Sequence, residues 1–169
     1  MPNLRNLGIR NEIIHPMKTT VITYGTFDLF HHGHLKLLTR LKALGDRLIV
    51  GVSTDEFNAC KGKKTIIPFA DRIEIVQSIK CVDLAIPETD WDQKEKDIEK
   101  YHVGILGMGH DWEGKFDNLN PICRVIYLPR TDGISSTQIK QSLGYFNKSH
   151  LNELKTSLDT ISSIIEKLS

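Results

Sequence analysis

Three histidines stand close together in the segment His31-His32-Gly33-His34. His31 and His34 are three residues apart, so on the first turn of a helix they would share one face. The start of a helix leaves four backbone N–H groups unpaired and carries the positive end of the helix dipole. Such a position binds anions, and two imidazoles there could donate hydrogen bonds to one phosphate chain. The spacing therefore predicts a phosphate site, with Gly33 leaving room for a ligand to approach the backbone.

Two other interpretations of these histidines stay open. A pair of solvent-facing loop histidines would have no function in binding. Alternatively, His31, His32 and His34 could ligate zinc together with a distant carboxylate. Zinc is disfavoured because the segment lacks the i, i+4 spacing of a helical zinc pair and no second His/Cys cluster is evident. We therefore predict no protein-held metal site.

A second candidate anion site follows a later apolar run. Residues 130–137 read Arg-Thr-Asp-Gly-Ile-Ser-Ser-Thr, which places several hydroxyls beside an arginine suited to bidentate phosphate contact. Ser135 is placed to cap a helix that begins there. A simple helix cap would explain Ser135 but neither Arg130 nor the run of hydroxyls. Two anion-binding helix starts at one edge of a sheet predict a triphosphate held between them.

The polar segment 53–69 is expected to be a mobile loop and contains Lys61, Lys63 and Lys64. Its composition favours a solvated surface loop. If the loop folds over the site, Lys61 and Lys63 would meet phosphate charge. The chain has neither GxxxxGK[ST] nor GxGxxG, so P-loop and dinucleotide-dehydrogenase functions have little support.

These residues need a scaffold, and the hydropathy pattern predicts a Rossmann-like, doubly wound α/β sandwich with a five-stranded parallel sheet. Near-continuous apolar runs are typical of strands that are covered on both faces. Gly45 is expected to end the first helix in a left-handed cap. In such folds ligands bind at the carboxyl ends of the strands. The expected strands are 19–24, 47–52, 83–87, 103–108 and 124–129, and the expected helices are 34–44, 70–80, 91–101 and 135–143.

The composition excludes several classes of protein. The chain has 169 residues, 22 basic and 21 acidic, and a formal net charge of +1. A near-neutral chain is a poor general nucleic-acid binder, and no apolar run is long enough to cross a bilayer. The first sixteen residues lack the apolar stretch of a signal peptide. Three scattered cysteines suit a reducing compartment, so we expect a cytoplasmic protein.

The C-terminal region carries a separate pattern. Leu151, Leu154, Leu158, Ile161, Ile165 and Leu168 recur at spacings of three and four, which is an a/d heptad seam. Such a helix either packs on its own domain or pairs between subunits, and the sequence favours neither. We therefore expect an N-terminal arm (1–18), a catalytic domain (19–143) and an amphipathic helix (144–169).

Several segments together resemble one family. They are TYGTFDLFHHGHLKLL, VSTDEFN, MGHDWEGKFD and LPRTDGISSTQIK, in this order between Thr19 and Leu143. They resemble the glycerol-3-phosphate cytidylyltransferase family of the HxGH nucleotidyltransferase superfamily. The resemblance implies transfer of CMP from CTP to sn-glycerol 3-phosphate, giving CDP-glycerol for teichoic acid or capsule synthesis. It also implies Mg²⁺ with CTP and a homodimer. Another polyol phosphate, phosphoethanolamine or phosphocholine as acceptor, ATP as donor, and a non-catalytic nucleotide-binding module remain alternatives.

The resemblance also implies roles for individual residues. His31, His34, Lys63 and Arg130 would act in catalysis on the CTP phosphates. Lys61 and Lys94 would bind the acceptor phosphate, and Arg72 matches a further polar position there. The nucleotide would be bound by Thr26, Phe27, His31, His34, Lys63, Asp111, Arg130, Thr131, Gly133, Ile134, Ser135, Ser136 and Thr137.

The chain departs from the family pattern at a few positions. His32 stands where an aromatic residue is usual, His110 replaces an aspartate, and Ser136 replaces a threonine but keeps the hydroxyl. Lys80 replaces an expected arginine, and because the two side chains are not equivalent at a bidentate contact, an acceptor role there is in doubt.

Overall fold

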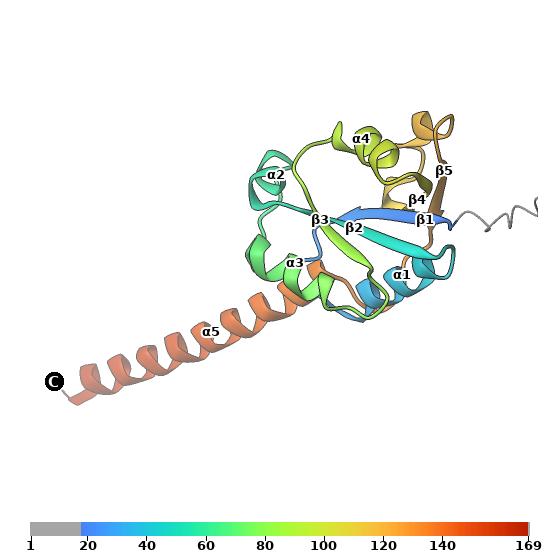
Figure 1. Ribbon diagram of the computed structural model, residues 1–169. Coiled ribbons are helices and arrows are strands. Elements are labelled where there is room, and N and C mark those ends of the chain that lie inside the picture. The colour runs from blue at the N-terminus through green and yellow to red at the C-terminus, as the bar shows by residue number, and fades with distance from the viewer. Residues whose placement is uncertain (1–17, 169) are drawn as a thin grey trace, which may run out of the picture.

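The computed structural model describes residues 18–168, with the backbone alone for 145–150, 162 and 164–168. Five parallel strands form one sheet in the order β3-β2-β1-β4-β5, which confirms the predicted Rossmann-like α/β fold (Figure 1). The order reverses between β1 and β4, and that reversal marks the position where such sheets bind ligands. The strands are β1 (Thr20–Gly25), β2 (Arg47–Ser53), β3 (Leu84–Glu88), β4 (Val103–Gly109) and β5 (Arg124–Leu128).

Helices cover both faces of the sheet, because neighbouring residues of β1 point to opposite sides. Val21 faces a core shared with Leu38 and Val76, whereas Ile22 faces one shared with Ile98 and Leu119. Figure 1 shows α1 and α3 on one side and α4 on the other. The helices are α1 (His32–Lys42), α2 (Asp55–Cys60), α3 (Phe69–Gln77), α4 (Gln93–Lys100) and α5 (Ser136–Leu168), with 3-10 turns η1 (His110–Trp112) and η2 (Asp117–Leu119).

The predicted left-handed cap at Gly45 is wrong. Helix α1 ends on Ala43 in a right-handed conformation, and Gly45 has no positive φ. A glycine is needed there for another reason. A Cβ at Gly45 would lie 2.6 Å from the carbonyl oxygen of Thr19, which accepts hydrogen bonds from the N–H groups of Asp46 and Arg47. Close approach of two backbone segments, rather than a turn conformation, therefore requires the glycine.

Segment 53–69 is not wholly a loop, because it contains helix α2. The Thr54 hydroxyl accepts a hydrogen bond from Phe57 N–H at 3.1 Å and caps this helix. Asp55 and Glu56 occupy the first turn, where the helix dipole favours acidic side chains. The signals of a helix start were thus present in the sequence, but the Lys-rich residues that follow concealed so short a helix.

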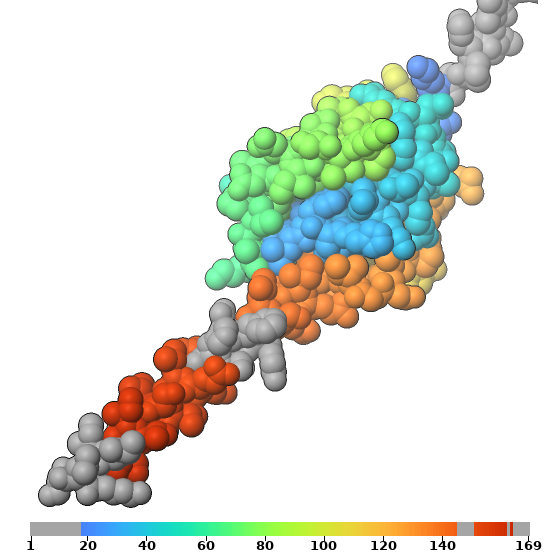
Figure 2. All heavy atoms as spheres, turned by 90° about the horizontal axis from the view of Figure 1, so that it is seen from below, coloured from blue at the N-terminus to red at the C-terminus, as the bar shows by residue number. Residues whose placement is uncertain are grey.

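Helix α5 begins as predicted but runs much further than Leu143. Ser135 Oγ accepts a hydrogen bond from Gln138 N–H at 3.1 Å, which confirms the predicted cap. The helix continues for 33 residues, so the boundary expected at 143/144 falls inside one helix. Its distal part projects away from the sheet (Figures 1 and 2). Leu151, Leu154, Leu158 and Ile161 are 54–64% exposed, so these four do not pack on their own domain.

Some sequence predictions concern residues beyond this description. The side chains of Ile165 and Leu168 and all but the last residue of the N-terminal arm lie outside the described residues. Within residues 18–168, no helix combines the length and the apolar character needed to cross a membrane.

Candidate active site

A cavity of about 490 Å³ opens at the carboxyl ends of the strands. Its lining includes Gly25 at the end of β1, Ser53 at the end of β2, Glu88 at the end of β3 and Gly109 at the end of β4. Six basic side chains but only three acidic ones line it, although the whole chain carries a net charge of only +1. A cavity with this excess of positive charge favours a polyanionic ligand. The basic side chains are Lys61, Lys63, Lys64, Lys94, Arg130 and Lys140, and the acidic ones are Asp28, Glu88 and Asp111.

The loop after β1 is held in an unusual conformation. Phe27 and Leu29 have φ values of 51° and 49°, a region that side chains other than glycine rarely adopt. Phe27 is buried, and its ring meets the His34 ring edge-on at 5.3 Å. Strain of this kind is typical of functional loops, where the surrounding structure holds it in place. Here it brings the loop backbone and His34 to the same wall of the cavity.

The two signature histidines lie together at the start of α1, as predicted. His31 caps the helix, with its Nδ1 accepting a hydrogen bond from Gly33 N–H at 3.0 Å. The rings of His31 and His34 stack with centroids 4.0 Å apart. Because Nδ1 of His31 accepts, the ring proton of neutral His31 is on Nε2, which is free to donate to a ligand. His34 Nδ1 is buried and has no hydrogen-bond partner among the described residues.

Both histidines are neutral at physiological pH. Burial lowers the pKa of His34 to about 4, with a further contribution from His31 and an opposing one from Asp28. Burial and the nearby Arg130 also lower the pKa of His31. Uncharged imidazoles beside basic side chains can donate hydrogen bonds to a phosphate chain. The negative charge of bound phosphates would oppose the effect of burial on the histidine pKa values.

The depressed pKa of His34 predicts how stability changes with pH. Between its ordinary value of 6.5 and about 4 the unfolded chain binds a proton that the folded chain does not, so the free energy of unfolding falls as the pH is lowered through this window. We expect His34→Asn to show a shallower fall than the wild type in urea unfolding across these pH values. His32→Asn, at an exposed position of the same motif, controls for loss of a histidine. Parallel curves for the wild type and His34→Asn would contradict this assignment.

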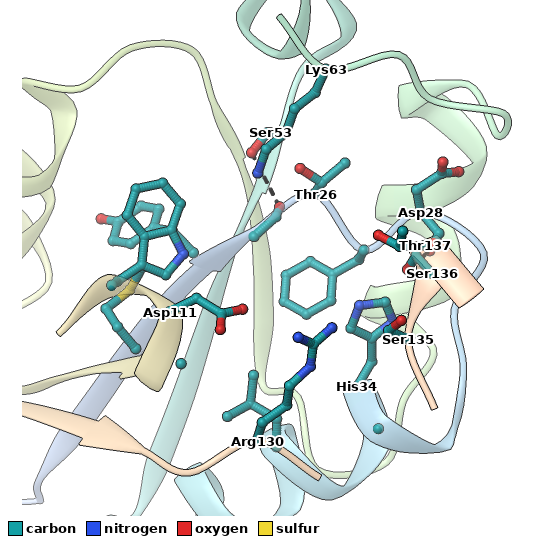
Figure 3. A pocket seen from close by; sticks show the side chains of 18 of the residues that line it. Thr26, Asp28, His34, Ser53, Lys63, Asp111, Arg130, Ser135, Ser136 and Thr137 are labelled. Atoms are coloured by element: carbon teal, nitrogen blue, oxygen red, sulfur yellow. Dashed lines mark hydrogen bonds between the residues drawn. The ribbon is translucent and has the colours of Figure 1, made fainter. Parts of the chain in front are cut away.

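Arg130 and the start of α5 line the wall next to the histidines. Figure 3 shows Ser135, Ser136 and Thr137 beside His34, with Asp111 on the opposite side of the cavity. Ser136 Oγ donates to the carbonyl oxygen of Asp28 at 2.8 Å, which ties α5 to the loop after β1. The two helix starts predicted to hold a triphosphate therefore adjoin each other.

Asp28 links three segments around this wall. Its carboxylate accepts from the N–H groups of Ile66 and Ile67, each at 3.0 Å, and forms an ion pair with Lys140 Nζ at 2.7 Å. Burial alone would raise the pKa of Asp28, but the hydrogen bonds from Lys140, Ile67 and Ile66 outweigh it and lower the pKa. Asp28 thus fastens the lysine-bearing loop and α5 to the histidine loop.

Lys61 and Lys63 of this loop line the cavity, so the condition of the prediction is met, and their contact with phosphate stays a prediction. The Lys61 side chain is only 8% exposed, and its Nζ donates to Ser53 Oγ at 2.8 Å. Burial lowers the pKa of Lys61, while Glu88 opposes that shift. Lys94 forms an ion pair with Glu88 at 2.7 Å. Two buried ammonium groups therefore flank one carboxylate, on the part of the cavity formed by α4 and the loop after α2.

Comparisons with known proteins agree with this geometry. Residues 22–142 match the family described as Cytidylyltransferase-like. The chain belongs to the cytidylyltransferase-like family. Over 123 residues it is 57% identical to the glycerol-3-phosphate cytidylyltransferase of Staphylococcus aureus and 58% identical to that of Bacillus spizizenii. These alignments cover 73% of this chain and 93% and 95% of the two relatives.

A solved structure supports the same fold for this cytidylyltransferase-like chain. The lipopolysaccharide core biosynthesis protein of Thermoplasma volcanium superposes with a TM-score of 0.62 at 27% identity. The match covers 68% of this chain and 99% of that protein.

Two residues assigned to ligand binding do not line the cavity of this cytidylyltransferase-like domain. Arg72 is buried, and its guanidinium donates to the carbonyl oxygens of Thr26, Ser53 and Ile67 and to the Asp55 carboxylate. With its donors directed to protein groups, Arg72 positions the loop after β1 rather than the acceptor. Gly133 has a φ of 86° and supplies a left-handed turn before α5. The other residues assigned by resemblance line the cavity.

The three histidines of the motif do not converge as zinc binding would require. The His32 side chain is exposed and is outside the cavity lining, and so is the Lys80 side chain. Among the described residues, no three His, Cys, Asp or Glu side chains are grouped closely enough to hold a metal ion.

Several lining residues of this cytidylyltransferase-like site were missed from the sequence. Asp28 belongs to the GTFD segment that adjoins the histidines, and that position was the available signal. Glu88 directly follows the predicted strand 83–87, at the edge of the sheet where ligands bind, and that position was a signal for it. The aromatic residues had no such signal. The missed residues include Tyr24, Asp28, Ser53, Lys64, Glu88, Trp91, Trp112, Phe116 and Lys140.

Proposed function

We propose that this chain transfers the cytidylyl group of CTP to the phosphate of sn-glycerol 3-phosphate, giving CDP-glycerol and pyrophosphate. The observation that carries this proposal is the division of one cavity into two basic parts. The histidines, Arg130 and the start of α5 form one part, and the buried lysines Lys61 and Lys94 form the other. A triphosphate and a phosphate monoester together match this division. The names of the Staphylococcus aureus and Bacillus spizizenii relatives support the same donor and acceptor.

The reaction needs little proton transfer. An oxygen of the acceptor phosphate, already an anion, attacks the α-phosphorus of CTP. The bond from this phosphorus to the oxygen that bridges to the β-phosphorus breaks, and that oxygen leaves with pyrophosphate. Catalysis then consists of positioning and of stabilising negative charge. This explains a cavity rich in histidine, lysine, arginine and helix N–H groups.

The neutral histidines fit this chemistry as hydrogen-bond donors. His31 Nε2–H is oriented because its other ring nitrogen accepts from Gly33 N–H. A fixed donor that faces charge developing on the phosphates stabilises the transition state more than water can. Lys63 and Arg130 add positive charge on the same cavity.

We further propose that Mg²⁺ enters with CTP. Mg²⁺ keeps several waters and commonly binds through one or two carboxylates together with substrate phosphates, so a dedicated protein cage is not required. Asp111 lines the cavity and is the carboxylate placed to contribute. When bound, Mg²⁺ would neutralise phosphate charge.

An assay of pyrophosphate release with a panel of acceptors tests the proposed function. We expect CTP with glycerol 3-phosphate to be clearly preferred over CTP with other polyol phosphates, phosphoethanolamine or phosphocholine, and over ATP with any of them. Preference for another pair would replace the acceptor or donor proposed here. Nucleotide binding without pyrophosphate release would indicate a non-catalytic module.

We also propose that the protein is cytoplasmic and that its product enters teichoic acid or capsule synthesis. We further propose that it forms a homodimer to which the distal part of α5 contributes. Leu151, Leu154, Leu158 and Ile161 form one exposed seam that is complementary to the same seam on a second copy. The polar face of this part of α5 is not rich in lysine or arginine, whereas the polar face of a helix bound to an anionic membrane surface would be.

Charged substitutions in this seam provide the test. We expect Leu154→Asp/Leu158→Asp to speed amide hydrogen exchange over residues 152–165, because most of the stability of a helix in a protein comes from packing of its amphipathic face. Exchange in the wild type should slow as the protein concentration rises. Asn152→Asp/Thr156→Asp places two acids elsewhere on the helix and is the matched control. Wild-type exchange that is independent of concentration would contradict pairing between copies, even if the mass measured by light scattering is that of a dimer.

A further inference from the structure

Lys94 lies in a cage of aromatic side chains. Its Nζ is 4.4 Å from the ring centroid of Tyr24, 5.2 Å from that of Trp91 and 5.3 Å from that of Phe116. The side chain is 3% exposed, and Nζ forms an ion pair with Glu88 Oε1 at 2.7 Å. All five residues line the cavity. Three aromatic faces and a carboxylate are the groups that recognise an alkylammonium ligand.

A second ammonium group occupies the neighbouring positions. Lys61 Nζ is 4.0 Å from the ring centroid of Phe57 and 5.6 Å from that of Trp91. It is also 3.6 Å from Glu88 Oε2, which accepts a hydrogen bond from Ser53 Oγ. Both carboxylate oxygens of Glu88 therefore already have protein partners. This corner of the cavity, formed by Lys61, Lys94 and Glu88, therefore holds two cations for one anion and suits a phosphate dianion.

We propose that Lys94 is a specificity-determining residue that excludes acceptor phosphates with a cationic head group and so restricts the reaction to phosphates of uncharged alcohols. The proposal rests on the function proposed above and defines its acceptor class. The aromatic faces that would attract an ethanolamine or choline head are occupied by the protein's own ammonium group. The cationic head group of a ligand entering this corner would meet two ammonium groups and no unpaired carboxylate. An arrangement of this kind rejects a wrong ligand by repulsion.

Loss of Lys94 alone would leave Glu88 with a weakened set of partners, so the informative variant removes both charges of the pair. Lys94→Met/Glu88→Gln empties the cage of its cation and removes the carboxylate that would lose its closest partner, while Lys61 keeps its hydrogen bond to Ser53 Oγ. Lys115→Met is the matched control. Lys115 also lies over an aromatic ring, 5.2 Å from the Trp112 centroid, but it is exposed and outside the cavity lining.

The test compares glycerol 3-phosphate with phosphocholine as acceptor in each variant. We expect kcat/KM for glycerol 3-phosphate divided by kcat/KM for phosphocholine to fall by roughly 10-fold or more in the double variant, the scale of a desolvated cation–π contact. This ratio should stay unchanged in Lys115→Met. If turnover is lost, calorimetry in the presence of a CTP analogue with a non-cleavable α–β link gives the dissociation constants of both acceptors. Their ratio then replaces the kinetic ratio. Circular dichroism confirms that the double variant is folded, and Lys94→Arg, which keeps the cation, should retain the preference.

An unchanged ratio in the double variant, by turnover or by binding, would overturn the proposal and leave Lys94 as a phosphate ligand only. Wild-type protein that uses phosphocholine as readily as glycerol 3-phosphate would also overturn it. Failure of cytidylyl transfer itself would look different, because the wild type would then release no pyrophosphate with any acceptor.

Discussion

Replacing His34 with alanine is expected to lower kcat for CDP-glycerol formation by about 10²–10³-fold, the effect of removing a preorganised donor from a transition state. His34 lies at the start of α1 with its ring buried against Phe27 and His31. Because burial lowers its pKa to about 4, we expect His34 to act as a neutral donor whose orientation is fixed before CTP arrives. Water that fills the space left by alanine cannot replace an oriented donor.

Pyrophosphate release at saturating CTP and glycerol 3-phosphate measures this effect. His32→Ala is the control, because His32 belongs to the same motif but is exposed and does not line the cavity. His31→Ala should lose activity on a similar scale and, through loss of the helix cap, also about 1 kcal/mol of stability. Near-wild-type turnover in His34→Ala would remove the histidine from the mechanism.

Replacing Arg72 with alanine has the largest expected effect on stability. It leaves the carbonyl oxygens of Thr26 and Ile67 without the hydrogen bonds they accept from the guanidinium. Each unsatisfied buried group costs about 1–3 kcal/mol, and the lost packing of a fully buried side chain adds to this. We therefore expect the free energy of unfolding to fall by roughly 3–5 kcal/mol. The Asp55 partner is partly exposed, so its ion pair contributes little of this total.

Urea unfolding of Arg72→Ala gives this free energy directly. Lys80→Ala, at an exposed position just after α3, is the control and should change stability little. Arg72→Lys keeps the charge but cannot reach as many carbonyl groups, so it should recover only part of the loss. A variant that is as stable as the wild type but has a raised KM for glycerol 3-phosphate would restore the acceptor role first expected for Arg72.

Much of the fold follows from patterns that are local in the sequence. The apolar runs at 103–108 and 124–129 became β4 and β5, and Ser135 caps α5 as its side chain predicts. The errors arise where distant segments decide the outcome. Gly45 is required by the backbone of Thr19, a contact that no local pattern reveals. The Lys-rich segment after α2 is drawn over the cavity because Asp28 accepts hydrogen bonds from Ile66 and Ile67.

In the candidate site, too, local features were predictable and contacts between distant segments were not. Spacing alone located His31 and His34, because a helix start and an i, i+3 pair are local features. The family resemblance could not distinguish a lysine that lines the cavity from an arginine that holds a loop, since both are basic residues at positions that match the family pattern. Burial and partners separate them: Lys94 lines the cavity, whereas Arg72 donates to backbone carbonyls. Trp91 was missed because only the fold brings it to Lys94, whereas the position of Glu88 after a predicted strand was a signal that was not used.

The path of one oxygen atom tests the central claim most directly. Glycerol 3-phosphate labelled with ¹⁸O in its phosphate is incubated with CTP and the wild-type protein, and the products are analysed by ³¹P NMR and mass spectrometry. Attack by the acceptor phosphate on the α-phosphorus predicts CDP-glycerol with ¹⁸O in the bridge between its two phosphorus atoms, and unlabelled pyrophosphate. Label in pyrophosphate, or CMP formed without CDP-glycerol, would contradict the account.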